Sequence, residues 1–318
     1  MNQPSGTIEG LFLDDDNATY DAVAKKFLSH RIFLAWILKH CVGEFKNCPI
    51  DDIVSKYIEG KPEVGNVPVN PDLTNAPRKI AGDNTEYKTV TEGMTVFDIR
   101  FVAYAPTTGE PIKLIVNIEA QKKHNPGYSL IKRAIFHGCR LISSQYGVEF
   151  EEPGFDGIKK VVSIWLCMTS PAKKESGITE YSFSEKHLVG QILNEEQEYD
   201  LIQSVMVYIG SSAESIENEL LKMLHLIFRA KLKAAEKTER LKSDFDVTLD
   251  NSMAKELNIM CNLSEGIAEA AMVESEERTT LKNLRSLIKT AKVSIEQAMD
   301  MLEIPALERP KYAELLGR

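Results

Sequence analysis

Two neighbouring segments near the middle of the chain alternate between apolar and polar positions. In residues 94–105 (MTVFDIRFVAYA) the odd-numbered positions 97–103 are apolar, and Asp98 lies on the opposite face. Residues 112–121 (IKLIVNIEAQ) have the pattern of a second strand, and turn-forming residues occupy 107–110 between them. The pattern therefore predicts a β-hairpin.

Segments with helical periodicity lie on both sides of this hairpin. Residues 18–59 are predicted to be helical in two parts, the second of which follows Pro49, and residues 128–146 are predicted to form a further helix. The side of that helix expected to be buried contains Ile131, Ile135, Gly138 and Ile142. The continuous apolar run at 160–168 (KVVSIWLCM) is typical of a central strand, so an α/β core is expected.

The pattern changes after residue 176. A β-like stretch at 181–183 and a strand at 204–209 precede an amphipathic helix over 216–242. Helices are also predicted over 252–274 and 276–292, and Ser294 with Gln297 forms a capping box for a last short helix. We therefore expect a mostly helical C-terminal region.

These patterns predict three parts of the chain. Residues 1–17 are expected to be a polar, acidic leader, residues 18–176 a core with N-terminal helices, and residues 177–318 the helical C-terminal region. The segment 61–79 is rich in Pro and Asn and has no period, which predicts a long connector.

Composition narrows the functional classes. Of 318 residues, 38 are Lys or Arg and 47 are Asp or Glu, so the net charge of −9 excludes a globally basic coat for nucleic acid. No apolar run approaches the roughly 20 residues of a membrane span, and the N-terminal residues do not resemble a signal peptide. The five cysteines contain no CxxC pair. We expect a cytoplasmic protein with reduced cysteines and no membrane partner.

The strongest chemical candidates lie on the predicted hairpin. Glu119 and Gln121 are two residues apart on one strand and share a face, and the hairpin can bring Asp98 beside Glu119. Converging carboxylates repel unless a cation lies between them. Mg²⁺, or Mn²⁺ in its place, suits this arrangement, with the carbonyl oxygen of Ala120 as a further ligand. The alternative is that these acids are simply solvated on an exposed face.

Basic residues follow the acids along the chain. Residues 78–175 carry 14 Lys and Arg against 11 Asp and Glu, which makes this part mildly basic. The candidate contacts to a nucleic-acid backbone are Lys122, Lys123, Arg133 and Arg140, the last two beside His137 on one helix face. A solvated helix face is the alternative interpretation for the two arginines.

The order of these elements resembles the PD-(D/E)XK nuclease core, and more closely the PD-(D/E)XK transposase family of Rpn-like recombination-promoting nucleases. The stretches that carry the resemblance are FDIRF at 97–101, NIEAQ at 117–121, GYSLIKRAIFHGCRLISSQYG at 127–147 and KKVVSIWLC at 159–167. In addition, TYDAVAKKFLSHRIFLAWILK resembles the family's opening D-x-x-x-K helix, matched by Asp21 and Lys25. These two residues are also spaced as a surface ion pair.

The resemblance implies a restriction-endonuclease-like mixed-sheet core. It also implies metal-dependent cleavage of DNA by phosphodiester hydrolysis, in the service of recombination or transposition. It implies that Asp98 and Glu119 bind the metal ion and that Gln121 stands where the motif usually has lysine. Glutamine offers hydrogen bonds but no charge, so Gln121 would position the attacking water while a nearby basic residue supplies charge.

Two functional alternatives stay open at this stage. The same fold can be kept for binding DNA or a protein after the chemistry is lost at Gln121, and the region after residue 180 can define a helical interaction protein. An RNase H-like transposase is disfavoured, because the sequence offers no third acid to complete that set. A homodimer that cuts both strands is an alternative to a monomer.

Overall fold

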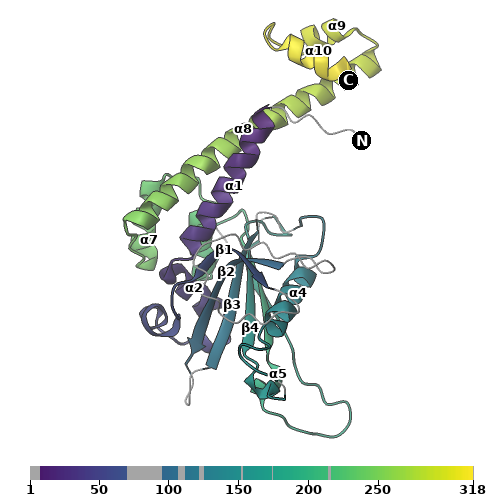
Figure 1. Cartoon of the computed structure of the whole chain (residues 1–318). Coiled ribbons are helices and arrows are strands. Elements are labelled where there is room, and N and C mark those ends of the chain that lie inside the picture. The colour runs from purple at the N-terminus through teal and green to yellow at the C-terminus, as the bar shows by residue number, and fades with distance from the viewer. Residues whose placement is uncertain are drawn as a thin grey trace. The chain divides into compact units, whose positions relative to one another are not determined.

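A six-stranded mixed sheet forms the centre of the chain in the computed structural model, which describes residues 8–69, 95–106, 112–121, 125–151, 153–173, 175–213 and 216–317. The strand order is β1-β2-β3-β4-β6-β5. Figure 1 labels the first four of these strands. The strands are β1 (Glu63–Val69), β2 (Thr95–Ala105), β3 (Ile112–Gln121), β4 (Lys160–Cys167), β5 (Gly177–Ser182) and β6 (Ile202–Tyr208). Strands β3, β4 and β6 are parallel neighbours, and the other pairs are antiparallel.

The hairpin and the central strand confirm the predictions from hydrophobic alternation. In the antiparallel pair β2–β3, Ile99 lies opposite Ile118 and Arg100 lies opposite Asn117. One further step along the same register places the position of Asp98 opposite that of Glu119. The turn predicted at 107–110 lies outside the described residues. Strand β4 is buried from Val161 onwards, as expected for a central strand.

The main helices lie before and after the strands along the chain, except α4, which lies between β3 and β4. They are α1 (Ile8–Leu28), α2 (Arg31–Cys41), α4 (Leu130–Ser143), α6 (Glu219–Phe228), α7 (Ala234–Phe245), α8 (Asn251–Ala291), α9 (Ile295–Met301) and α10 (Arg309–Gly317). Short helical segments are Gly43–Phe45, α3 (Ile50–Asp52), a π-helical turn at Ile53–Tyr57, Phe155–Gly157 and α5 (Glu196–Tyr199). None of the helices in the described ranges has the length and apolar character needed to cross a bilayer.

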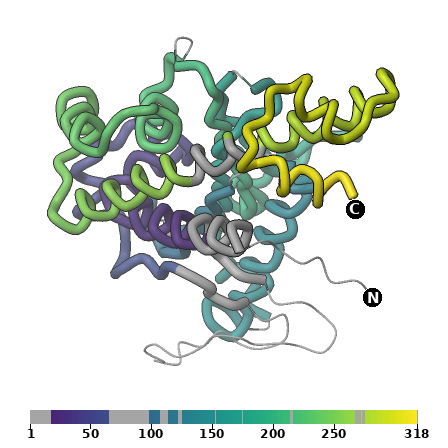
Figure 2. The backbone as a smooth tube through the Cα atoms, turned by 90° about the horizontal axis from the view of Figure 1, so that it is seen from above, coloured from purple at the N-terminus to yellow at the C-terminus, as the bar shows by residue number. Residues whose placement is uncertain are grey.

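Helices cover both faces of the sheet. On one face, α4 packs Leu130 and Ala134 against Trp165 of β4 and Met206 of β6. Gln203 of β6 points to the opposite face, where it contacts the C-terminal end of α2. Figure 2 shows α2 and α4 on the two sides of the sheet. The side chains of β3 and β4 are therefore covered on both faces.

The chain divides into two compact units, 21–260 and 1–20 together with 261–318. The first contains the sheet. The second has its own apolar cluster, formed where the end of α8 meets α9 and α10: Leu284, Ala298, Met299, Ile304 and Tyr312. The predicted capping box is present, because Ser294 and Gln297 bond each other's backbone N–H groups at the start of α9.

Several predicted boundaries differ from the structure. Helix α1 begins at Ile8, so the predicted leader is helical from that residue on, and residues 1–7 lie outside the described ranges. The connector predicted over 61–79 contains strand β1, an edge strand whose register shifts between Val64 and Val67. The sheet also crosses the boundary predicted at residue 176, because β6 lies between β4 and β5.

The predicted helices also need correction. The helix predicted over 216–242 is two helices, α6 and α7, whereas the two predicted over 252–292 are one, α8. In α4 the buried side is rotated from the predicted one: Ile135 is 44% exposed, whereas His137 and Arg140 are buried. A hydrophobic pattern assigns only apolar residues to the buried side of a helix, so it does not identify these two polar residues as buried.

Close packing of α4 on β6 makes Gly138 sensitive to substitution. A Cβ atom there would lie 3.0 Å from Cγ2 of Ile202. We expect Gly138→Leu to lower the free energy of unfolding by about 1–3 kcal/mol through overpacking. The control is Cys139→Leu on the exposed side of the same helix, with an expected change within about 0.5 kcal/mol. Urea denaturation measures both, and equal effects would contradict the packing argument.

Candidate functional site

Asp98 and Glu119 meet at the end of the β2–β3 hairpin and bond to each other's strands. The backbone N–H of Asp98 donates to Oε1 of Glu119 at 3.3 Å, and the backbone N–H of Ala120 donates to Oδ2 of Asp98 at 2.9 Å. Asp98 is 9% exposed and Glu119 is 1% exposed. The structure therefore brings the two predicted acids together, in a buried setting.

Helix α1 brings a lysine to this pair. The Nζ atom of Lys25 lies 2.8 Å from Oδ1 of Asp98 and 2.5 Å from Oδ2 of Asp21. The same helix buries Ala24 and Phe27 in the core, which fixes the position of the intervening residue. Asp21 and Lys25 do form the predicted ion pair, but Lys25 also contacts the acidic pair and its side chain is only 19% exposed.

Two polar side chains surround the Glu119 carboxylate. The Nδ2 group of Asn117, two residues earlier on β3, donates to Oε1 of Glu119 at 3.2 Å. The Nδ1 atom of His137, on α4, lies 3.7 Å from the same oxygen. The Oδ1 atom of Asn117 is buried and has no hydrogen-bond partner among the described residues. Glu119 thus lies among nitrogen groups from the sheet and from α4.

Burial and repulsion shift the ionisation of this cluster. Burial raises the pKa of Asp98 to about 6, and the neighbouring Glu119 charge adds to the rise, although bonds from Lys25 and Ala120 oppose it. Burial alone would lower the pKa of Lys25, but its bonds to Asp21 and Asp98 outweigh burial and raise that pKa. Lys25 therefore keeps its positive charge, and it lies beside a carboxyl that ionises at a higher pH than a solvated aspartate does.

Arg133 of α4 lies next to His137 and contacts two aromatic side chains. Nη1 of Arg133 donates to the hydroxyl of Tyr128 at 2.5 Å, and its Nε donates to Nε2 of His137 at 3.4 Å. The guanidinium carbon lies 5.5 Å from the ring centroid of Trp165. Within the described ranges no carboxylate forms an ion pair with Arg133, so its positive charge is not neutralised by a carboxylate there.

The other predicted site residues differ in their placement. Gln121 ends β3 on the same face as Glu119 and is partly exposed, and the backbone of Ala120 belongs to the acidic pair. Arg140 is 8% exposed, so its burial argues against a direct phosphate contact. Lys122 and Lys123 lie outside the described residues.

Three residues join the site without having been predicted as its members. The spacing of Lys25 from Asp21 indicates only a local ion pair, since a sequence does not show which distant carboxylate a lysine reaches. The sequence does indicate Asn117, because it is a polar residue on the same face of an apolar strand as Glu119. His137 lies one position from the predicted buried side of α4.

The carboxylate oxygens of this site are ligands of the kind that a hard divalent ion prefers. Mg²⁺ is commonly held by one or two carboxylates, with water and phosphate oxygens completing its shell, and Asp98 and Glu119 supply the carboxylates. Among the described residues, no three acids, histidines or cysteines form a metal-binding group. Lys25 occupies one oxygen of Asp98, so a metal ion at this oxygen requires the lysine to move.

Comparisons with family models, with curated proteins and with solved structures gave no match to this chain. The resemblance to the PD-(D/E)XK transposase family, based on short motifs and their order, therefore stays a prediction.

The raised pKa of Asp98 predicts a pH-dependent stability in metal-free protein. Between about pH 4, its value when unfolded, and about pH 6, the folded chain keeps a proton that the unfolded chain has released. This contribution to stability is lost as the pH rises through that window. We expect the Tm of Asp98→Asn to rise relative to wild type between those values in EDTA, as measured by thermal melting.

The matched control for this experiment is Asp51→Asn, which changes an exposed aspartate in the first turn of α3. Its Tm should follow wild type across the same pH range. A constant difference between wild type and Asp98→Asn would show that Asp98 ionises normally.

Proposed function

We propose that this chain is a metal-dependent DNA endonuclease that hydrolyses phosphodiester bonds, in support of recombination or transposition. The observation that carries the proposal is the convergence of Asp98 and Glu119 from adjacent strands with Lys25 at the same carboxylate. Two acids and a firmly charged ammonium are the groups that phosphodiester hydrolysis needs in one place.

The order of elements around these residues supports the finer assignment of the fold. An acid on β2, the E-x-Q motif on β3, helix α4 and the buried strand β4 follow one another as in a restriction-endonuclease-like core. Helix α4 then covers the face of the sheet to which Glu119 points. On this basis we propose that the sheet and α4 form a PD-(D/E)XK-type core.

Asp98, Glu119 and the carbonyl of Ala120 are the residues that would hold Mg²⁺ or Mn²⁺. Such an ion would lower the pKa of bound water and offset charge on the phosphate. A cation bound there would favour the ionised form of Asp98, because it would oppose the repulsion from Glu119. Lys25 pairs with both Asp98 and Asp21, and the Asp21 side chain is 49% exposed, so substrate would approach from the side of Asp21.

Lys25 is a candidate to replace the lysine that position 121 lacks. We propose that its ammonium, held at Asp98 by helix α1, supplies the positive charge that Gln121 lacks. Gln121 is partly exposed at the end of β3 and would orient the attacking water through its amide. The charge and the hydrogen bonds would thus come from two residues instead of one.

A second candidate is a catalytically degenerate relative that binds DNA or a protein. The burial of Glu119, whose side chain is 2% exposed, favours this alternative, since a metal ion and a phosphate must both reach the acids. Gln121 favours it as well. Nicking assays separate the two candidates.

Moving the charge between residues gives the sharpest test of the catalytic proposal. We expect wild type to nick supercoiled plasmid with Mg²⁺ or Mn²⁺, and Lys25→Met to lower the rate by about 10²–10³-fold, a typical loss for one electrostatic stabiliser. Gln121→Lys should restore nicking in the Lys25→Met background, because it returns an ammonium to the usual position. Glu119→Gln should abolish nicking.

Lys26→Met is the matched control, because Lys26 pairs with Glu256 and its side chain is 63% exposed. It should nick like wild type. A melting scan adds a readout independent of activity: Mg²⁺ should raise the Tm of wild type and leave Glu119→Gln unchanged. If wild type neither nicks nor shifts, and Gln121→Lys does not confer nicking, the degenerate binder becomes the better description.

Arg133 provides a test of DNA binding. Its charge is held by Tyr128, His137 and Trp165 without an ion-paired carboxylate in the described ranges, so it is available to a phosphate. We expect Arg133→Gln to weaken duplex binding in EDTA and to reduce the salt slope by about one unit. Arg240→Gln, on the exposed side of α7, should leave the slope unchanged. Equal slopes for all three proteins would remove Arg133 from the interface.

A further inference from the structure

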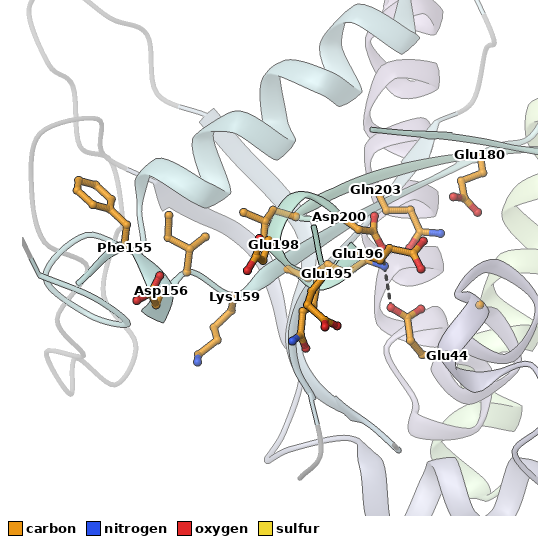
Figure 3. Close-up of a pocket in the computed structure, with 15 residues that line it drawn as sticks. Glu44, Phe155, Asp156, Lys159, Glu180, Glu195, Glu196, Glu198, Asp200 and Gln203 are labelled. Carbon is orange, nitrogen blue, oxygen red and sulfur yellow. Dashed lines mark hydrogen bonds and ion pairs between the residues drawn. The ribbon is translucent and has the colours of Figure 1, made fainter. Parts of the chain in front are cut away.

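The structure contains a pocket of about 1400 Å³, whose lining residues are drawn in Figure 3. The register of the sheet places it at the opposite end of the strands from Asp98 and Glu119. Its floor includes the start of β4 and β6, where Lys160 pairs in register with Leu114, five positions before Glu119 on β3. The residues that line it include Glu44, Asp156, Glu180, Glu195, Glu196 and Glu198. The pocket is therefore separate from the proposed nuclease site.

The charge of this pocket is strongly negative. Lys159 and Lys160 are the two lysines among its lining residues. Lys160 is already engaged, since its Nζ atom lies 2.7 Å from Oε1 of Glu44 and 2.5 Å from Oδ2 of Asp200. Glu195, Glu196 and Glu198 form no ion pair with a residue of the described ranges. An excess of carboxylates is left facing the pocket.

One buried side chain of the pocket carries an acceptor without a partner in the described ranges. Gln203 lines the pocket and is 2% exposed. Its Nε2 group donates to the carbonyl of Cys41 at 3.3 Å, which fixes the orientation of the amide, and its Oε1 atom has no partner in the described ranges. An unsatisfied buried acceptor is costly, so an N–H donor from a ligand would relieve it.

The loop before α5 adds an apolar surface. Between β5 and α5 four apolar residues are almost fully exposed: Leu188 at 84%, Val189 at 95%, Ile192 at 75% and Leu193 at 81%. This loop runs directly into Glu195 and Glu196 of the pocket lining. Several almost fully exposed apolar side chains in one short loop, next to a polar pocket, are typical of an interaction site.

We propose that this pocket and loop dock a basic, apolar segment of a protein partner. The acids and Gln203 would accept N–H groups from its Lys or Arg side chains, and the loop would contact its apolar residues. The volume exceeds the roughly 300–1,000 Å³ of small-molecule sites, which favours a peptide over a small amine. In the described ranges the acids do not gather as a metal-binding group. The proposal does not depend on nuclease activity.

The test uses the full chain and a fluorescent peptide of alternating lysine and leucine, titrated by anisotropy at about 0.15 M salt, where distant charges are screened. Glu195→Gln with Glu196→Gln should weaken binding at least about 3-fold, as expected for two exposed ion pairs. Val189→Ser with Leu193→Ser should also weaken it. The matched control, Glu236→Gln with Glu239→Gln on exposed positions of α7, removes the same charge and should bind like wild type.

Gln203→Leu separates a binding role from a structural one. It removes the unsatisfied acceptor together with the bond to the Cys41 carbonyl, so the peptide affinity should fall about 10-fold, the value for one hydrogen bond to a charged donor, in protein whose melting transition shows that it is still folded. The proposal is overturned if neither loop nor pocket variant weakens binding, or if the α7 control weakens it equally. It is also overturned if a lysine–serine peptide or spermine binds as tightly as the lysine–leucine peptide, because charge alone would then explain the binding.

Discussion

The buried pair of carboxylates at Asp98 and Glu119 is the constraint on which the arrangement around the sheet depends. Two like charges at low dielectric are costly unless charges or hydrogen-bond donors compensate them. Compensation comes from outside the hairpin as well as from within it: α1 brings the Lys25 ammonium to Asp98, and Asn117 of β3 donates to Glu119, with His137 of α4 lying 3.7 Å from the same oxygen. The backbone N–H groups of the two strands supply the rest. The positions of both helices are thus coupled to the acids.

The same constraint explains which parts of the site can be predicted from the sequence. Side chains of a strand alternate with a period of two, so the shared face of Asn117, Glu119 and Gln121 follows from the order of residues alone. The register of a hairpin then brings Asp98 to Glu119. Lys25 is different, because its contact with Asp98 joins residues 73 positions apart through the packing of α1. Local spacing reveals only its bond to Asp21.

Elements at the edges of the fold are harder to predict for related reasons. Strand β1 contains Pro68 and a shift in register, so it lacks the alternation that reveals β2 and β3. Helix α4 hides its buried side because His137 and Arg140 are polar residues in buried positions. The acidic pocket gives no local signal either, since its carboxylates come from segments as distant as Glu44 and Glu198.

The positive charge of the site comes from Lys25 on a helix, and this has a physical consequence that a lysine on the strand would not have. A lysine at position 121 would be fixed by the hydrogen bonds of the sheet itself. Lys25 is instead fixed by the packing of Ala24, Phe27 and Leu28 in the core and by its bond to Asp21. Lys25 opposes the effect of burial on the pKa of Asp98, so the helix both offsets the charge of this acid in the metal-free chain and keeps an ammonium within reach of any phosphate bound there. Loosening of α1 would therefore remove the charge from the site without changing any residue on the sheet.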